Sequence, residues 1–318
     1  MKSTSASHSG KAHGKIILIG EHAVVYGEPA IAIPFKAASV EVIIKKTDRP
    51  VTITSNYYAG ALSKAPKELN YLSVLLQKIS SDFKKTIDHI DINITSHIPP
   101  ERGMGSSAAV SMAFVQALLS YFDISLEKEQ LLYYVDLSEK IIHGNPSGID
   151  ARITSSEEPL FYKKGYVFES LPLNISGYLV VADTGETGQT SRAVADVAKA
   201  LKNNYEIAEP LIRHIGELTL KAKSAIFNND LYTLGRTLSK AHESLKQLTV
   251  SNNSLDQLVK TALEAGALGA KLTGGGRGGC MIALATSRKK AESIEHKLLK
   301  QGAAKTWIHR LKGEDINE

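Results

Sequence analysis

Short apolar runs dominate the first third of the chain. Glycine, proline or polar residues bound each run, and some runs alternate apolar with polar positions, which is the pattern of β-strands. The strands predicted in this way lie at residues 15–20, 30–34, 39–44 and 90–94. The first third is therefore expected to be rich in β-structure.

After residue 105 the apolar positions follow the spacing of amphipathic helices. Residues 106–142 predict two helices that separate near residues 123–125, where Ser125 offers a helix start. Further along, helices are predicted at 191–248, 254–265 and 288–301, and strands at 160–162, 177–182, 269–285 (with a glycine loop) and 306–311. This mixture indicates an α+β fold.

The chain is long enough for two domains. Its 318 residues exceed the roughly 100–200 residues of a typical domain. A boundary near residue 185 is expected, which divides the chain into domains 1–185 and 186–318. With 43% hydrophobic and 22% charged residues, the composition is that of an ordinary globular protein.

Composition also bears on compartment and partners. No apolar run approaches the roughly 20 residues of a membrane span, and the polar N-terminus lacks the apolar stretch of a secretory signal. The single cysteine, Cys280, is interpreted as a packed thiol in a reducing compartment. A cytoplasmic location without a membrane partner is therefore expected. The pI near 9.0 comes from dispersed basic residues, so a nucleic-acid partner is not expected and anionic small substrates explain the charge.

The strongest chemical signal lies in the segment Gly103-Met104-Gly105-Ser106-Ser107-Ala108-Ala109. Glycines let a loop wrap closely around a ligand, and a helix that follows directly points free backbone N–H groups and its positive dipole end at an anion. Serine hydroxyls can donate to phosphate oxygens or ligate magnesium. A nucleotide-phosphate site is predicted here, and the alternative is a plain serine helix cap.

Two carboxylates follow this loop. Glu139 lies on a predicted helix, and Asp150 ends the run Gly-Asn-Pro-Ser-Gly-Ile-Asp. Lys15 begins the first predicted strand, and a lysine beside an aspartate at a phosphoryl-accepting hydroxyl is a recurrent chemical requirement. Lys15 or Glu139 alone is more often solvated or structural, and Asp150 alone is as readily a helix cap, so these residues indicate a function only when read together.

A second glycine cluster spans residues 274–279 and contains Arg277. It has the form of the dinucleotide fingerprint G-x-G-x-x-G, but it leads into an apolar strand instead of a helix, which argues against a Rossmann site. Five glycines in six residues favour close approach of the backbone to a ligand or to the other loop. The P-loop and protein-kinase motifs are absent from the sequence.

Three segments in order resemble the characteristic motifs of the GHMP kinase superfamily, which includes galactokinase, homoserine kinase, mevalonate kinase and phosphomevalonate kinase. The matching segments are residues 15–27, 99–109 and 271–279. The first and third, together with residues 143–150, are most similar to the mevalonate kinase family. Two positions depart from the pattern, because Met104 replaces a leucine and Arg277 stands in a loop of small residues.

The resemblance implies a two-domain GHMP kinase fold, with a ribosomal-S5-like N-terminal domain, a ferredoxin-like C-terminal domain and an active site in the cleft between them. It implies ATP-dependent phosphorylation of the primary hydroxyl of mevalonate, with Asp150 as the base and Lys15 orienting the hydroxyl. By the same resemblance, Ser107 and Glu139 hold Mg²⁺. The implied nucleotide contacts are Pro99, Gly103, Met104, Gly105, Ser106, Ser107 and Ala108, and the implied substrate contacts are Glu21, His22, Thr184 and Gly275.

Two alternatives stay open at this point. A sister enzyme such as phosphomevalonate kinase would share the fold and the phosphate loop, but it needs extra basic residues for its phosphorylated substrate. A non-catalytic sensor would bind ATP or a metabolite on the same scaffold, although the joint presence of Lys15, Ser107, Glu139 and Asp150 argues against it. Members of the superfamily are often homodimers, which this sequence neither requires nor excludes.

Overall fold

The structure is a computed structural model that describes residues 7–144, 148–165 and 168–312. The chain forms two compact units that interleave in sequence. Unit 1 comprises Met1–Gly14, Ala38–Pro99 and Gly105–Ser155, and unit 2 comprises Lys15–Ala37, Pro100–Met104 and Ser156–Glu318. The phosphate loop therefore begins in unit 2 and continues in unit 1 from Gly105. The expected domain boundary near residue 185 stays a prediction.

One sheet has seven strands within the described residues, in the order β4-β3-β5-β2-β6-β7, with β1 paired to β2. Its strands are β1 (Ser7–Ile19), β2 (Pro29–Lys46), β3 (Thr52–Thr54), β4 (Ala59–Ala61), β5 (Ile90–Ser96), β6 (Leu160–Lys163) and β7 (Glu169–Ser170). The sequence predicted two short strands where β2 is continuous. One continuous strand pairs with different neighbours along its length, since Pro29–Ala32 pair with β6 and Val40–Lys46 pair with β5, and β2 also pairs with β1.

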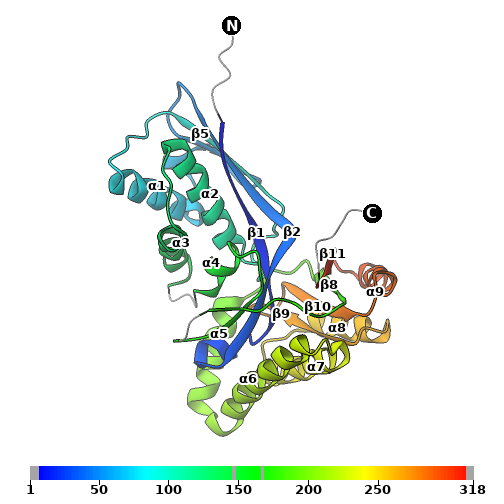
Figure 1. Ribbon diagram of the computed structural model, residues 1–318. Coiled ribbons are helices and arrows are strands. Elements are labelled where there is room, and N and C mark those ends of the chain that lie inside the picture. Colours follow the sequence, from blue (N-terminus) through cyan, green and yellow to red (C-terminus); the bar gives the residue numbers. More distant parts are fainter. Residues whose placement is uncertain (1–6, 145–147, 166–167, 313–318) are drawn as a thin grey trace. The chain divides into compact units, whose positions relative to one another are not determined.

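Four α-helices of unit 1 lie among the described residues. They are α1 (Asn70–Asp82), α2 (Ser106–Phe122), α3 (Lys128–His143) and α4 (Ile149–Ile153). Figure 1 shows α1, α2 and α3 side by side, and α4 packs against α2 and α3. The predicted break between α2 and α3 is confirmed. However, α3 begins at Lys128 and is capped by Glu127 with Gln130 in a capping box, so Ser125 is not its cap.

Unit 2 contains a four-stranded antiparallel sheet in the order β11-β8-β10-β9. Its strands are β8 (Tyr178–Asp183), β9 (Gly269–Thr273), β10 (Cys280–Ala285) and β11 (Lys305–Arg310), and its helices are α5 (Thr190–Asn203), α6 (Tyr205–Phe227), α7 (Leu231–Gln247), α8 (Asn253–Glu264) and α9 (Arg288–Lys300). The helices α7, α8 and α9 pack against this sheet (Figure 1). All six residues of β10 are buried, which explains the unbroken apolar run in the sequence.

Cys280 opens β10 and is fully buried. Burial raises the pKa of its thiol well above the ordinary value, so the thiolate needed for nucleophilic or metal chemistry is disfavoured. The interpretation of Cys280 as a packing residue agrees with this position. Among the described residues, no helix is both long enough and apolar enough to cross a lipid bilayer.

Candidate active site

The second half of the phosphate loop starts helix α2 in unit 1. Gly105 is the N-cap residue with φ 70°, a left-handed conformation that glycine adopts without strain, and Ser106 and Ser107 form the first turn. The serines are therefore inside the helix, so the alternative of a serine N-cap is wrong. A glycine N-cap has no side chain to occupy the first-turn N–H groups, which leaves them able to bind an anion.

Ser107 reaches from this turn to helix α3. Its hydroxyl donates to Glu139 Oε1 at 2.7 Å, and the His143 ring lies 3.3 Å from the same hydroxyl oxygen and 3.7 Å from Glu139 Oε2. Glu139 is only 2% exposed. Burial and, to a lesser extent, the charge of Glu139 raise the pKa of the Tyr71 phenol. Unit 1 thus brings the two predicted metal residues, Ser107 and Glu139, together.

This pair fits the donor preference of Mg²⁺. The ion takes oxygen ligands and keeps several waters, so one or two protein oxygens plus substrate phosphates suffice to hold it. The Ser107 hydroxyl and the Glu139 carboxylate are such oxygens. No group of three or more His, Cys, Asp or Glu side chains that could hold a metal occurs in the part of the chain that the structure describes. Phosphate and water oxygens would therefore complete the coordination.

Asp150 lies in the first turn of the short helix α4 of unit 1 and is half-buried. Its backbone carbonyl oxygen accepts from the backbone N–H of Thr154 at 3.2 Å and from the Thr154 hydroxyl at 2.9 Å. The neighbouring Arg152 pairs with Glu129 of α3. The ion pair links α4 to α3, which carries Glu139, and α4 also packs against α2, which carries Ser107. Residues 145–147 of the same motif lie outside the described residues.

Lys15 is buried in β1 and is tied to the beginning of the phosphate loop within unit 2. Its backbone N–H donates to the carbonyl oxygen of Met104 at 2.9 Å. Met104 is itself 1% exposed, as a hydrophobic replacement for leucine requires. Pro99, which precedes this segment, is half-buried in unit 1. The position of Lys15 is therefore coupled through the backbone to the loop predicted to bind phosphate.

Glu21 and Lys271 form a buried ion pair in unit 2. Glu21 is 4% exposed and Lys271 is fully buried, and the Lys271 ammonium contacts Glu21 Oε1 and the Leu272 carbonyl oxygen. Burial raises the pKa of Glu21 and lowers that of Lys271, while each charge opposes the shift of the other. Lys15 adds a second positive charge near Glu21. Glu21 Oε2 has no hydrogen-bond partner among the described residues.

His22 connects this pair to the second glycine loop. Its Nε2 lies 3.0 Å from the Gly275 carbonyl oxygen, and because a carbonyl only accepts, Nε2 carries the proton and Nδ1 is left as an acceptor. Burial lowers the pKa of His22 to about 4, so the ring is neutral near pH 7. Unit 2 thus brings Lys15, Glu21, His22 and Gly275 together.

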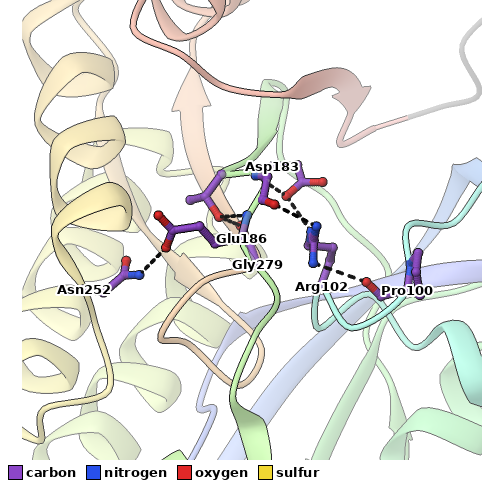
Figure 2. Close-up of polar contacts among 8 residues, drawn as sticks. Pro100, Arg102, Asp183, Glu186, Asn252 and Gly279 are labelled. Carbon is purple, nitrogen blue, oxygen red and sulfur yellow. Dashed lines mark hydrogen bonds and ion pairs between the residues drawn. The ribbon is translucent and has the colours of Figure 1, made fainter.

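Thr184 also contacts the second glycine loop. Its hydroxyl and its backbone N–H both donate to the Gly279 carbonyl oxygen, at 2.8 and 2.9 Å. Figure 2 shows that Glu186 lies between Gly279 and Asn252. Its backbone carbonyl oxygen accepts from the Gly279 backbone N–H at 2.8 Å, and its Oε2 accepts from the Asn252 side-chain amide at 2.7 Å. Thr184 therefore holds the loop, and its predicted contact with substrate stays a prediction.

Arg277 is directed at protein groups. Its guanidinium donates to the Thr249 carbonyl oxygen at 3.0 Å and pairs with Asp196 of α5 at 2.5 Å. Its backbone N–H donates to the Val250 carbonyl oxygen at 2.9 Å. The sequence left open whether this side chain reaches a nucleotide or solvent. The structure instead connects it to α5 and to the segment between α7 and α8.

Comparison with known proteins identifies the family. The model of the GHMP kinases N-terminal domain matches residues 70–156, and that of the GHMP kinases C-terminal region matches residues 222–304. The mevalonate kinase of Pyrococcus horikoshii is 36% identical over 300 residues, which cover 88% of this chain and 89% of that protein. The chain belongs to the mevalonate kinase family of the GHMP kinases.

Solved structures of mevalonate kinases agree with this assignment. The enzyme of methicillin-resistant Staphylococcus aureus MRSA252 is 38% identical, with 96% of this chain and 99% of that chain covered and a TM-score of 0.74. The L. major mevalonate kinase in complex with R-mevalonate is 26% identical, with 98% of each chain covered and a TM-score of 0.85. The predicted two-domain GHMP kinase fold and the predicted family are thus confirmed.

Sequence reasoning gave no role to several residues that shape this mevalonate kinase family site. Lys271 was only part of a motif, and Arg102 and Asp183 were not singled out. A signal for Lys271 was present, because a lysine inside the buried strand Gly269–Thr273 requires a partner of opposite charge. For Arg102 and Asp183, which are 81 positions apart and form an ion pair, the sequence carries no comparable signal.

Proposed function

We propose that this chain transfers the γ-phosphoryl group of ATP to the primary hydroxyl of mevalonate, giving 5-phosphomevalonate and ADP. The observation that carries the proposal is the match over most of the chain to mevalonate kinases. In the reaction, the bond between mevalonate oxygen and the γ-phosphorus forms while the bond from that phosphorus to the β,γ-bridging oxygen breaks. The hydroxyl proton leaves the substrate, so a base must accept it.

Asp150 is proposed as this base and Lys15 as the cation that orients the hydroxyl. The support for Asp150 is its place on α4, which packs against the two helices carrying Ser107 and Glu139. The support for Lys15 is its backbone bond to Met104 and its charge beside Glu21. A buried ammonium next to the acceptor favours the alkoxide that develops during phosphoryl transfer.

The phosphate loop is proposed to bind the ATP phosphates through the first-turn N–H groups of α2. Support comes from the glycine N-cap and the half-buried serines that follow it. Ser107 and Glu139 are proposed to hold Mg²⁺, which when bound neutralises phosphate charge and orients the phosphates. The residues in these two proposals lie at the start of α2 and on α3. Substitutions there therefore test both proposals without changing Asp150.

Glu21 and His22 are proposed to form the acceptor pocket with Gly275. The unpartnered Glu21 Oε2 and the acceptor Nδ1 of His22 are two groups that can accept hydrogen bonds from hydroxyl donors. Lys271 holds the other oxygen of Glu21, so the pocket offers only one oxygen of that carboxylate. Dimerisation and a cytoplasmic location stay predictions, and light scattering on the purified protein tests the first.

The test is ADP release from Mg-ATP with mevalonate, phosphomevalonate, homoserine and galactose offered one at a time. Turnover with mevalonate alone is expected. Turnover only with phosphomevalonate would replace the proposed substrate, and ATP binding without turnover on any acceptor would support the sensor alternative. The matched variant Asp150→Asn should lose about 10²–10⁴-fold in kcat and still bind a non-hydrolysable ATP analogue.

A further inference from the structure

Arg102 stands directly before the first glycine of the phosphate loop, where a basic side chain would ordinarily be interpreted as a phosphate ligand. Its guanidinium is instead occupied by protein acceptors. Nε donates to Asp183 Oδ1 at 2.9 Å, Nη2 donates to the Gly185 carbonyl oxygen at 3.0 Å, and Nη1 makes a longer contact of 3.5 Å with the Pro100 carbonyl oxygen. Figure 2 shows Arg102 between Asp183 and Pro100.

Asp183 is a rigid anchor for this guanidinium. It is the last residue of β8, where it pairs with Cys280 of β10 on one side and Lys305 of β11 on the other. Its Oδ1 also accepts from the Gly185 backbone N–H at 2.8 Å, and its side chain is 7% exposed. A charge-assisted hydrogen bond to a buried group at the end of an interior strand fixes the arginine more strongly than a surface ion pair would.

The backbone around Arg102 lies directly on the second glycine loop. A Cβ at Gly103 would come within 3.1 Å of Gly274 Cα, and a Cβ at Gly279 would come within 2.9 Å of the Arg102 carbonyl oxygen. On its other side, the Glu101 backbone carbonyl oxygen accepts from the Gly188 backbone N–H at 2.7 Å. Side chains larger than hydrogen would force these two loops apart, so their mutual position is set by backbone contact.

We propose that Arg102 is a positioning residue that holds the beginning of the phosphate loop on the β8 end and the second glycine loop. Through the Met104 carbonyl oxygen, the same segment fixes the backbone of Lys15. The inference rests on the proposed function for its effect on turnover. Its structural part concerns only unit 2 and holds whichever acceptor the enzyme uses.

The geometry distinguishes this role from that of a phosphate ligand. Arg102 has a 14% exposed side chain whose charge is already paired with Asp183, so it adds little free positive potential for a nucleotide. A planar guanidinium can bond several fixed acceptors at once, whereas a lysine ammonium is a single point charge on a flexible stem. Replacement by lysine therefore retains the charge and loses the fork geometry.

The experiment compares Arg102→Ala and Arg102→Lys with the wild-type protein. In the alanine variant, backbone amide hydrogen exchange at residues 103–104 and 278–279 should rise about tenfold or more, because both sides of the contact lose their anchor. A misplacement of about 1 Å at a reacting group lowers turnover by roughly 100-fold, so kcat/KM for ATP should fall by that order. KM for mevalonate should change less than threefold. The lysine variant should lose about tenfold in kcat/KM for ATP.

Arg288→Ala is the matched control. Arg288 is an exposed arginine of α9 that pairs with Glu292, and its loss removes the same charge from unit 2 without touching either loop. Wild-type exchange and turnover are expected for it. The proposal is overturned if Arg102→Lys equals the wild type, or if Arg102→Ala weakens binding of a non-hydrolysable ATP analogue while loop exchange is unchanged. Should the alanine variant not fold, the lysine variant decides. An inactive wild type would refute the proposed function and leave the exchange readout valid.

Discussion

Two buried carboxylates, Glu21 in unit 2 and Glu139 in unit 1, differ in the group that each one contacts. Glu21 contacts the ammonium of Lys271, which is buried with it. Glu139 contacts the neutral hydroxyl of Ser107 at 2.7 Å, with the His143 ring at 3.7 Å. The two carboxylates are almost equally buried, at 4% and 2% exposed.

The difference separates a carboxylate that is paired with a buried cation from one that is held by an uncharged hydroxyl. A buried carboxylate next to a lysine is largely neutralised within the protein. Its main effects are then on stability and on the polarity of its surroundings. The Ser107 hydroxyl carries no charge, so its hydrogen bond orients Glu139 without neutralising the carboxylate. Glu21 is therefore expected to matter most for stability, and Glu139 most for turnover.

Removing the lysine from the first pair should have the largest effect. Lys271→Met leaves Glu21 buried without its cation, and breaking a buried ion pair on one side lowers the free energy of unfolding by about 3–5 kcal/mol. Urea denaturation measures this loss. Lys260→Met is the control, because Lys260 pairs with Glu264 on the surface and should change stability by less than about 0.5 kcal/mol. The double variant Glu21→Gln/Lys271→Met should recover part of the loss, and an unstable double variant would argue against the charge explanation.

Glu139→Gln should lower turnover strongly and change stability little, which is the opposite of Lys271→Met. Loss of the anionic oxygen should lower kcat by about 10²–10³-fold, in the range found when one transition-state-stabilising group is removed. The free energy of unfolding should change by less than about 1 kcal/mol, because glutamine can still accept from Ser107. Steady-state kinetics over a range of Mg²⁺ concentration, with Mn²⁺ binding measured in the presence of a non-hydrolysable ATP analogue, checks both points. Glu264→Gln, an exposed glutamate of α8, is the control. Undiminished metal binding would remove the metal role from Glu139.

Acid should destabilise unit 2 through its buried neutral histidines. Burial lowers the pKa of His22 and of His242 to about 4, below the ordinary value of 6.5. Between these values the unfolded chain binds protons that the folded chain does not, so stability is full above pH 6.5 and falls as the pH drops toward 4. Each histidine contributes a slope of about 1.4 kcal/mol per pH unit.

Urea denaturation at intervals from pH 4.5 to 7.5 measures this dependence. His22→Gln should remove one such contribution and make the curve flatter. His296→Gln, which changes an exposed histidine of α9, should leave the slope as it is. Equal slopes for the wild type and His22→Gln would show that His22 is not buried as a neutral ring.

Ser107→Ala should have a smaller effect than Lys271→Met, Glu139→Gln or the protonation of the buried histidines. It removes the hydroxyl that donates to Glu139 and leaves the carboxylate in place, so a loss of about tenfold in kcat is expected, equivalent to about 1.4 kcal/mol. Steady-state kinetics with saturating ATP measures it. Ser120→Ala, at the exposed far end of the same helix, should behave as the wild type. A loss of kcat as large as that of Glu139→Gln would show that the Ser107 hydroxyl contributes as much to turnover as the Glu139 carboxylate.

Much of the fold could be predicted from the sequence. Strongly periodic segments such as α8, α9 and the buried strand β10 were located to within about two residues, because their apolar spacing reports directly which face is buried. Element ends were less accurate, as with Ser125, where a side chain able to cap was present but Glu127 and Gln130 made the better box. Helix α1 and the short strands β3, β4 and β7 were not predicted.

The candidate site was likewise predicted where its residues are close in sequence and missed where they are distant. Local chemistry identified the loop around Ser107 and the carboxylates that follow it, because loop, helix start and acidic residues lie in one stretch of sequence. Pairings across long separations were not predictable. Glu21 and Lys271 are 250 positions apart, and neither segment carries a sequence signal that identifies the other as its partner.

The sequence by itself determined the family, the periodic elements and the chemical groups of the site, since these depend on residue type and local spacing. Only the tertiary structure decided which charges are paired. It assigned Glu21 to Lys271, Arg102 to Asp183 and Arg277 to Asp196, and in each case two distant segments supply the partners. The physical reason is that a buried charge requires a partner but places no condition on where in the chain that partner comes from.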